Sequence, residues 1–320
     1  MTTPDRLTAW AYLRRVFATS RPELLSMLWP DGNMSAPARV IETANAIRNQ
    51  SPDLPTTMKG DPGQVATQAA DDLAWCDEHG ARLITPDDDE WPAYRLEEAF
   101  GHTGVADGLK PHQAAPFALF AKGTGHLADL LDDAVSVIGG RAATRSTIEA
   151  THSMVEAAVN DGRTIVSTSS VGTDTAAHKA ALNAGGNTVV VAASGLGNLY
   201  PARNADLFSE VEHGGLVITE YCPTIGPARL RLLARYRLVT ALSAGTLVMA
   251  AGYRSATVAT AELAVKMGRP LMVYPSGDRP DRSGNDRILQ TVGGHSVTNA
   301  GQVRTVLDLC PVDSQVAARG

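Results

Sequence analysis

The sequence has few cysteines and no long hydrophobic run, and each shortage excludes a class of protein. Its cysteines, at positions 76, 222 and 310, are far apart and form no Cys-x-x-Cys pair, so neither a disulfide framework nor a zinc site is indicated. Apolar segments such as 188–193 are far shorter than the roughly 18 residues that a membrane-spanning helix needs. The first residues lack the basic-then-apolar pattern of a signal peptide. We therefore expect a cytoplasmic protein with no membrane contact, metal or cofactor.

Basic residues are also in the minority, but they are distributed unevenly. Residues 1–133 contain 11 Lys and Arg against 20 Asp and Glu, a balance of −9, whereas residues 134–308 contain 16 against 13, a balance of +3. A polyanion is therefore expected to touch the second part of the chain. A chain of 320 residues has room for one large domain and a smaller one.

The sequence of segment 134–144 predicts a strand, then a glycine turn, then the start of a helix. Its β-branched residues end at Gly139 and Gly140, which let backbone N–H groups approach a ligand, and Arg141 follows where an anion would sit. Either Thr144, or Ser146 with Glu149, is expected to cap the helix that comes next. This pattern favours a phosphate-binding turn, although plain connections share it.

Beyond residue 134, short β-rich runs alternate with helical patterns. This alternation predicts an α/β fold of the Rossmann-like, doubly wound type, with a mostly parallel sheet and function at the carboxyl ends of its strands. The expected strands are 134–139, 164–168, 188–193, 216–219, 245–250 and 270–274. The expected helices are 145–160, 174–184, 203–213, 234–242 and 257–267.

The rest of the chain divides by composition. We expect a small helical module of the SAM or helix-turn-helix type over 1–63, serving protein contacts rather than reading DNA, because its arginines are scattered. Residues 64–133 are expected to connect it to the sheet and to pack on that sheet, with strands at 81–86 and 116–123. The main domain spans 134–308 and a tail spans 309–320. The acidic run 87–90 is expected to be a solvated turn rather than a metal site.

Three further loops carry groups that suit an anion. Ser167 and Gly172 follow the second expected strand, where Asp174 is expected to cap a helix on which His178 is packed and hydrogen-bonded. A glycine turn at Gly195 follows the third strand and leads to Arg203 and Asn204 at a helix start. Between the fourth and fifth strands lie four arginines within nine residues, namely Arg229, Arg231, Arg235 and Arg237. This arginine cluster is the strongest polyanion signal in the sequence, although a solvated face is the alternative.

In order and spacing, these motifs resemble the DprA/Smf family (DNA-processing protein A) over about residues 81–300. The resemblance rests on Val137-Ile-Gly-Gly-Arg-Ala-Ala-Thr144, Gly172-Thr-Asp174-Thr-Ala-Ala-His178, Gly195-Leu-Gly, Tyr200-Pro201, Thr219-Glu220-Tyr, Arg235-Tyr-Arg237 and Arg254-Ser255. It implies a dimeric, non-enzymatic protein that binds and protects single-stranded DNA and helps to load the RecA recombinase during transformation or recombination. By position, the backbone-binding groove would be lined by Arg141, Ser167, Arg203, Asn204, Arg235 and Arg237, with glycine turns supplying N–H donors.

The chain departs from the family pattern at four positions. Thr168, Ala256 and Ser276 replace glycines, and Tyr236 replaces an asparagine. Three added side chains narrow the approach of a phosphate, whereas Tyr236 offers a face on which a base can stack. The resemblance therefore indicates a divergent member, whose chain leaves no room for the C-terminal winged helix of some relatives.

Two alternatives belong to a different class of function. Related folds include nucleotide-binding sensors and LOG-type phosphoribohydrolases, which cleave nucleoside monophosphates. Such an enzyme needs a carboxylate beside a Pro-Gly-Gly loop, and here the loop starting at Pro275 departs from that motif, with Asp278 and Glu220 as the available acids. The sequence therefore favours DNA binding over hydrolysis.

Overall fold

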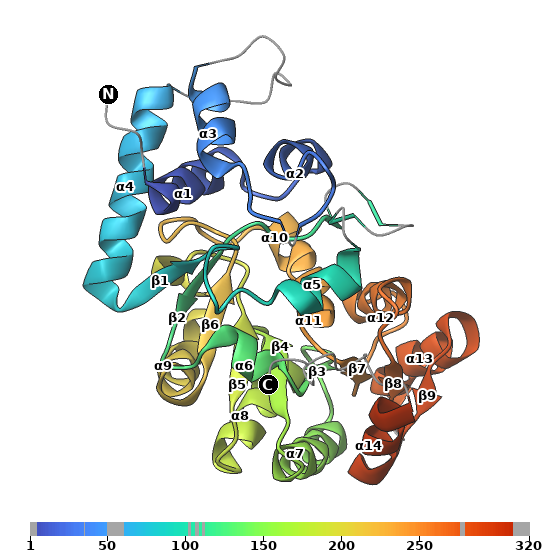
Figure 1. Cartoon of the computed structure of the whole chain (residues 1–320). Coiled ribbons are helices and arrows are strands. Elements are labelled where there is room, and N and C mark those ends of the chain that lie inside the picture. Colours follow the sequence, from blue (N-terminus) through green and yellow to red (C-terminus); the bar gives the residue numbers. More distant parts are fainter. Residues whose placement is uncertain are drawn as a thin grey trace, which may run out of the picture.

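A single nine-stranded sheet forms the centre of the computed structural model, which describes residues 5–34, 36–49, 61–101, 104–105, 109–110, 113–275 and 279–309. Helices cover both faces of this sheet (Figure 1). The strands are β1 Ala81–Ile84, β2 Leu119–Lys122, β3 Ala134–Ile138, β4 Thr164–Thr168, β5 Thr188–Val191, β6 Leu216–Thr219, β7 Gly245–Val248, β8 Leu271–Val273 and β9 His295–Ser296.

The helices alternate with the strands from β3 onward. The α-helices are α1 Arg6–Val16, α2 Pro22–Leu28, α3 Val40–Arg48, α4 Pro62–His79, α5 Ala93–Phe100, α6 Leu127–Leu131, α7 Arg145–Asn160, α8 Thr173–Asn183, α9 Ala205–Gly214, α10 Arg229–Ala234, α11 Tyr236–Ala241, α12 Ala256–Lys266, α13 Arg279–Arg287 and α14 Ala300–Leu309. Short turns of other helix types are η2 Leu196–Asn198, η3 Ala202–Asn204 and η4 Ile288–Val292.

The strand order is β1-β2-β6-β5-β4-β3-β7-β8-β9. In this spatial order, neighbouring strands from β6 through β3 to β9 run parallel to each other. The strands β1 and β2 add an antiparallel edge beside β6. The α/β class and the six expected strands of the main domain are confirmed. Residues 64–133 differ from the expectation in one respect, because β1 and β2 extend the sheet rather than pack on it.

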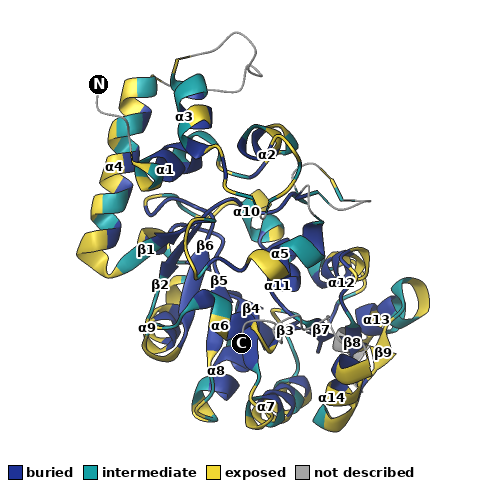
Figure 2. Ribbon diagram, viewed as in Figure 1, coloured by how far each residue is buried: buried dark blue, intermediate teal, exposed yellow. Residues whose placement is uncertain are grey.

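The strands are buried on both faces, as a sheet covered by helices requires. In β3, Val135 and Val137 face the apolar cluster under α7, α8 and α14, whereas Ala134 and Ile138 face the cluster under α5, α6, α11 and α12. Figure 2 shows this arrangement as buried strands between helices whose outer sides are exposed. The period-2 alternation of apolar side chains thus holds one sheet between two helical layers.

The N-terminal helices attach to the β1–β2 edge through aromatic residues. The ring of Trp10 on α1 lies 6.3 Å from both Trp29 and Phe117, measured between centroids, and Phe117 lies two residues before β2. Arg6 adds an ion pair to Asp87, and α1 packs along α4. None of the helices in the described part of the chain has the length and apolar character that a membrane span needs.

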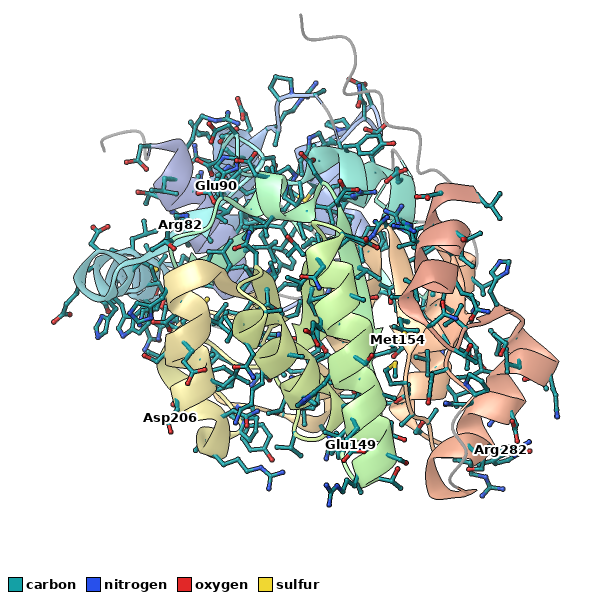
Figure 3. The ribbon with its side chains drawn as sticks, turned by 90° about the horizontal axis from the view of Figure 1, so that it is seen from below. Arg82, Glu90, Glu149, Met154, Asp206 and Arg282 are labelled. Carbon is teal, nitrogen blue, oxygen red and sulfur yellow. The ribbon has the colours of Figure 1, made fainter. Side chains whose placement is uncertain are left out.

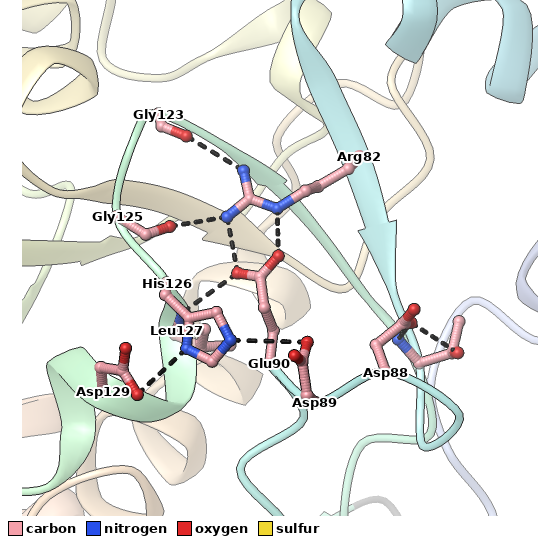
Figure 4. Close-up of polar contacts among 10 residues, drawn as sticks. Arg82, Asp88, Asp89, Glu90, Gly123, Gly125, His126, Leu127 and Asp129 are labelled. Atoms are coloured by element: carbon pink, nitrogen blue, oxygen red, sulfur yellow. Dashed lines mark hydrogen bonds and ion pairs between the residues drawn. The ribbon is translucent and has the colours of Figure 1, made fainter.

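The acidic run 87–90 is a turn with Asp87, Asp88 and Asp89 exposed, as the sequence predicted, but most of its carboxylates also bind protein donors. Asp87 binds Arg6 and the indole N–H of Trp10, Asp88 accepts from the backbone and hydroxyl of Thr85, and Glu90 forms a bidentate pair with Arg82. Asp89 remains exposed beside His126 (Figure 4). Three of these four carboxylates therefore fix the turn by binding donors from neighbouring elements.

Candidate nucleic-acid interface

The loops that follow the parallel strands meet along one edge of the sheet. Figure 3 shows this edge through Glu149, Asp206 and Arg282, each near the start of a helix that follows a strand, with Arg82 and Glu90 on the opposite side of the molecule. The carboxyl ends of parallel strands are where open α/β sheets bind ligands. A ligand is therefore expected to bind at this edge, and most of the predicted site residues belong to the loops that form it.

A pocket of about 320 Å³ opens at this edge. It draws residues from the loops after β3, β4 and β5 and from α10, and it is lined by Arg141, Ser170, Val171, Tyr200, Pro201, Arg203, Leu232 and Arg235. Three of the predicted site residues, Arg141, Arg203 and Arg235, are thus brought together although they span 95 positions of the sequence (235 minus 141, counted inclusively).

Arg235 forms the buried part of this pocket and is only 2 % exposed. Its two terminal nitrogens each donate to a serine hydroxyl, those of Ser169 and Ser170, at 2.6 Å. Its Nε is also buried and has no partner among the described residues. Burial lowers the pKa of this guanidinium, which nevertheless stays protonated at neutral pH. The two serines therefore hold a positive charge at the wall of the pocket, which favours an anionic ligand.

Arg141 and Arg203 supply the exposed positive charge of the pocket. Neither guanidinium has an ion-pair partner in the described ranges. Arg141 stands between β3 and α7, where Thr144 caps the helix by accepting from the Thr147 N–H, as one of the two predicted caps does. The amino end of α7 adds its partial positive charge beside Arg141.

The side chain of Asp174 lies behind the pocket and does not cap α8, contrary to prediction; the helix begins at Thr173 with Gly172 as its N-cap. The carboxylate accepts the Gly139 N–H at 3.2 Å and the hydroxyl of Thr168. Burial raises its pKa to about 6, while the Thr168 hydroxyl and the charge of Arg235 oppose that rise. Because Asp174 occupies the Gly139 N–H, that group is not a donor to a ligand, which corrects the expectation for this glycine.

The predicted glycines serve the shape of the loops. Gly172 has a φ of +85°, and a Cβ there would lie 2.4 Å from the Gly140 carbonyl oxygen, so the loops after β3 and β4 can touch only at a glycine. Gly140 accepts the Thr173 N–H. The Gly195 N–H donates to Ile225, and a Cβ at Gly195 would lie 2.0 Å from the Cys222 oxygen. Gly195 therefore holds the η2 turn and offers no donor to a ligand.

Three other predicted ligands point away from the pocket. Arg237 is 1 % exposed and forms a bidentate ion pair with Glu220. The Ser167 hydroxyl is fully buried and donates to the Val137 carbonyl at 2.6 Å. The Asn204 amide donates to Ser169 and Thr175, which fastens the loop behind Arg235. These side chains are structural, which corrects their assignment to the surface of a groove.

The arginine cluster is divided by the geometry of its helices. Arg229 is exposed at the start of α10, whereas Arg231 lies over the Tyr221 ring, 5.3 Å from its centroid, and donates to Gly226. Tyr236 is only partly exposed and burial raises its pKa, so it does not present the open face that the sequence predicted. The exposed aromatic residue of the pocket is Tyr200, which is 44 % exposed.

Two remaining expectations concern individual residues. His178 is fully buried, with Nδ1 2.7 Å from the Thr188 hydroxyl and Nε2 3.1 Å from the Thr168 carbonyl, as predicted for a packed histidine. Burial lowers its pKa to about 4. Ala256 begins α12, while Ser276 and Asp278 lie outside the described residues. Sequence reasoning missed Ser169, Ser170 and Tyr200, although the hydroxyl run 167–170 and the aromatic residue of Tyr200-Pro201 were the available signals.

Comparison with known proteins gives the chain its family. The family model for DNA recombination-mediator protein A matches residues 82–308. A putative DNA processing protein DprA of Mycobacterium tuberculosis is 33 % identical over 295 residues, which cover 92 % of this chain and 73 % of that protein. The DNA processing protein DprA of Streptococcus pneumoniae is 34 % identical over 190 residues, 59 % of this chain and 66 % of that protein.

Solved structures agree with the sequence comparison. The X-ray structure of Streptococcus pneumoniae DprA covers 95 % of this chain and is itself covered to 98 %, with a TM-score of 0.69 at 23 % identity, which shows the common fold. A Helicobacter pylori DNA processing protein A, solved to describe its single-stranded DNA binding mode, covers 63 % of this chain and is itself covered to 91 %, with a TM-score of 0.56 at 29 % identity. The chain therefore belongs to the DNA recombination-mediator protein A family.

Proposed function

We propose that this protein binds single-stranded DNA through its sugar–phosphate backbone, without sequence preference, at the pocket of Arg141, Arg203 and Arg235. One observation carries the proposal: the two exposed, unpaired guanidiniums of Arg141 and Arg203 line the same pocket as the buried positive charge of Arg235. Phosphate contacts of this kind release counterions and do not depend on the base. The exposed Tyr200 ring at the rim is suited to stack on a base.

The comparisons support this proposal at two levels. The family is one of recombination mediators, and the Helicobacter pylori relative is described as binding single-stranded DNA. The motifs by which the sequence resembles the DprA/Smf family include Arg141 and Tyr200, which both line the pocket.

The finer role follows the family resemblance. We expect the protein to act in the cytoplasm as a homodimer that protects single strands and assists RecA loading in transformation or recombination. The molecular mass in solution tests the dimer. The rate at which RecA displaces a single-strand binding protein from DNA, with and without this protein, tests the loading.

Binding rather than catalysis is the proposed activity. Of the two acids that a LOG-type hydrolase would use, Glu220 is 2 % exposed and its two oxygens are held by Arg237. A carboxylate held in this way is a poor general acid or base, because both of its oxygens are occupied and it is buried away from any substrate. A nucleotide-sensing role would place a mononucleotide in the same pocket, and competition by nucleotide for bound DNA measures it.

The experiment is fluorescence anisotropy with a labelled oligo-dT of about 30 nucleotides and a mixed-sequence oligomer of equal length. Wild-type protein is expected to bind both with similar affinity, and Arg141→Ala is expected to weaken both by roughly tenfold. Arg304→Ala is the matched control, because Arg304 pairs with Asp161 at the far end of α7. Absence of binding at low salt would reject the proposal.

A further inference from the structure

The loop after β7 carries a second group of side chains suited to a ligand, and these side chains do not line the pocket. The strands β3 and β7 are neighbours in the sheet, and from them the chain proceeds in opposite directions, to β4 and to β8 (Figure 1). Such a reversal leaves a crevice at the carboxyl ends of the two strands. Tyr253 and Arg254 lie in the loop that leaves β7 at this crevice.

Tyr253 presents an aromatic ring that is held in place from one side. Tyr253 as a whole is 57 % exposed. The Arg287 guanidinium lies over the ring, 5.1 Å from the centroid, and donates to the Tyr253 carbonyl at 2.8 Å. Because the Arg287 guanidinium covers one face, a ligand ring would stack on the opposite face. A large exposed aromatic ring fixed in this way is a platform for a second π-system.

The backbone of this loop is fixed as well. The Gly284 N–H of α13 donates to the Ala251 carbonyl at 2.7 Å, and a Cβ at Gly284 would lie 2.3 Å from that oxygen, so α13 is packed directly onto the loop. The Asn285 amide donates to the carbonyls of Met249 and Tyr274, the first residues after β7 and β8. Tyr253 therefore stands on a rigid support, which lowers the entropy cost of binding a flexible strand.

Arg254 places a positive charge next to the ring. It is exposed and has no ion-pair partner in the part of the chain that the structure describes. The helix α12 begins two residues later, and its N-cap, Ser255, makes no side-chain capping bond and has a buried hydroxyl without a described partner. An aromatic ring followed at once by an unpaired cation matches the alternation of base and phosphate along a nucleic acid strand.

The platform lies close to the pocket. Gly140, the neighbour of Arg141, faces Ala250, where a Cβ on the glycine would lie 3.9 Å from the alanine Cβ. Tyr253 follows Ala250 by three residues, which span at most about 11 Å of chain. One strand can therefore occupy both places.

Building on the proposed function, we propose that Tyr253 stacks on a base of bound single-stranded DNA while Arg254 contacts an adjacent phosphate, forming a second subsite beyond the arginine pocket. The ligand of this subsite is the same strand, a few nucleotides along from the phosphates at Arg141. Affinity then depends on oligomer length: a short oligomer occupies the pocket alone, and a longer one gains the stacking contact.

The test compares oligo-dT of about 3 and about 20 nucleotides by anisotropy. Tyr253→Ala is expected to weaken the longer oligomer by about tenfold, the effect of losing one stacked base, and to leave the shorter one unchanged. Tyr253→Trp is expected to restore binding of the longer oligomer. Tyr94→Ala is the control, since Tyr94 is also an exposed tyrosine near an arginine, but it lies on α5 beside the amino end of β3, where Arg95 binds Leu131.

A second readout separates stacking from a general loss of structure. In a 20-nucleotide strand whose thymines are replaced by abasic sites, Tyr253→Ala is expected to have no effect, whereas Arg254→Ala still weakens binding and lowers the salt dependence by about 0.7 in slope. An equal loss on dT and abasic strands overturns the subsite. The subsite is also overturned if Tyr253→Ala binds the longer oligomer as tightly as the wild type while the shorter oligomer still binds. That result would leave the arginine pocket intact. Failure of wild-type protein to bind either oligomer rejects the pocket itself.

Discussion

The guanidinium of Arg237 holds the carboxylate of Glu220 through two parallel hydrogen bonds of 2.6 and 2.7 Å inside the protein. The same carboxylate lies 3.9 Å from Arg14 of α1, and all three side chains are at most 1 % exposed. Glu220 directly follows β6, so this pair joins the end of a strand to α11 and to the N-terminal helices. Arg235, only two residues before Arg237, instead faces the pocket.

We expect Arg237→Ala to destabilise the protein by about 3–5 kcal/mol, because it leaves the buried Glu220 carboxylate without its main partner. The glutamate keeps only Arg14, whose Nε and Nη1 have no hydrogen-bond partner among the described residues. Urea denaturation measures the free energy of unfolding. In contrast, Arg141→Ala changes an exposed side chain and is expected to alter that free energy by less than about 0.5 kcal/mol. A mild loss in Arg237→Ala, similar to that in Arg141→Ala, would contradict the structural role.

Gly172 is expected to tolerate no side chain. Its φ of +85° already disfavours other residues, and the Gly140 oxygen would meet a Cβ at 2.4 Å. Gly162 provides a matched control, because its φ is +83° but nothing lies within 4 Å of a Cβ there. Gly162→Ala should cost about 1 kcal/mol from backbone strain alone, and Gly172→Ala should cost at least about 2 kcal/mol more. Equal losses of unfolding free energy in the two variants would show that the loops after β3 and β4 do not touch.

The two buried titratable groups near β4 are expected to act oppositely on stability as pH falls. Asp174 has a folded pKa raised by burial to about 6 from 3.8, so its contribution to the free energy of unfolding grows as pH falls through that window. His178 has a folded pKa lowered by burial to about 4 from 6.5, so its contribution is complete above 6.5 and is lost as pH falls. Each effect amounts to about 3 kcal/mol.

Urea denaturation at about pH 5 and about pH 7.5 separates these two contributions. Asp174→Asn removes the group that favours acid, so its unfolding free energy should fall more steeply toward pH 5 than that of the wild type. His178→Gln removes the opposing group, and its unfolding free energy should rise toward pH 5 relative to the wild type. A pH dependence identical in all three proteins would refute the assignment of these pKa shifts.

The fold was predictable from the sequence because its signals are local and repeated. The β-branched run of β3 and the valines of β5 indicate strands covered on both faces, and the glycine turns mark their ends. The helix α13 was not predicted, since its polar sequence has no apolar periodicity to indicate a buried face. β9 was also missed because it comprises only His295 and Ser296.

The site was predictable only in part, because a residue type does not specify a direction. Residues two positions apart on a helix are rotated by about 200° around its axis. Arg235 and Arg237 therefore point to different surroundings although their side chains are the same. In the same way, Asp174 occupied a plausible capping position, yet the positive φ of Gly172 starts the helix one residue earlier and turns the carboxylate inward. Which cations remain free depends on contacts across the sheet that no local pattern records.

The most direct test of the central claim is the salt dependence of single-stranded DNA binding. If Arg141, Arg203 and Arg235 each contact a phosphate, the logarithm of the affinity should fall with the logarithm of salt concentration with a slope of about −2, and Arg141→Ala should make that slope shallower by about 0.7. Arg304→Ala should reproduce the wild-type slope, since Arg304 is paired with Asp161 away from the pocket. A slope that Arg141→Ala leaves unchanged would contradict a direct contact between this pocket and the DNA backbone.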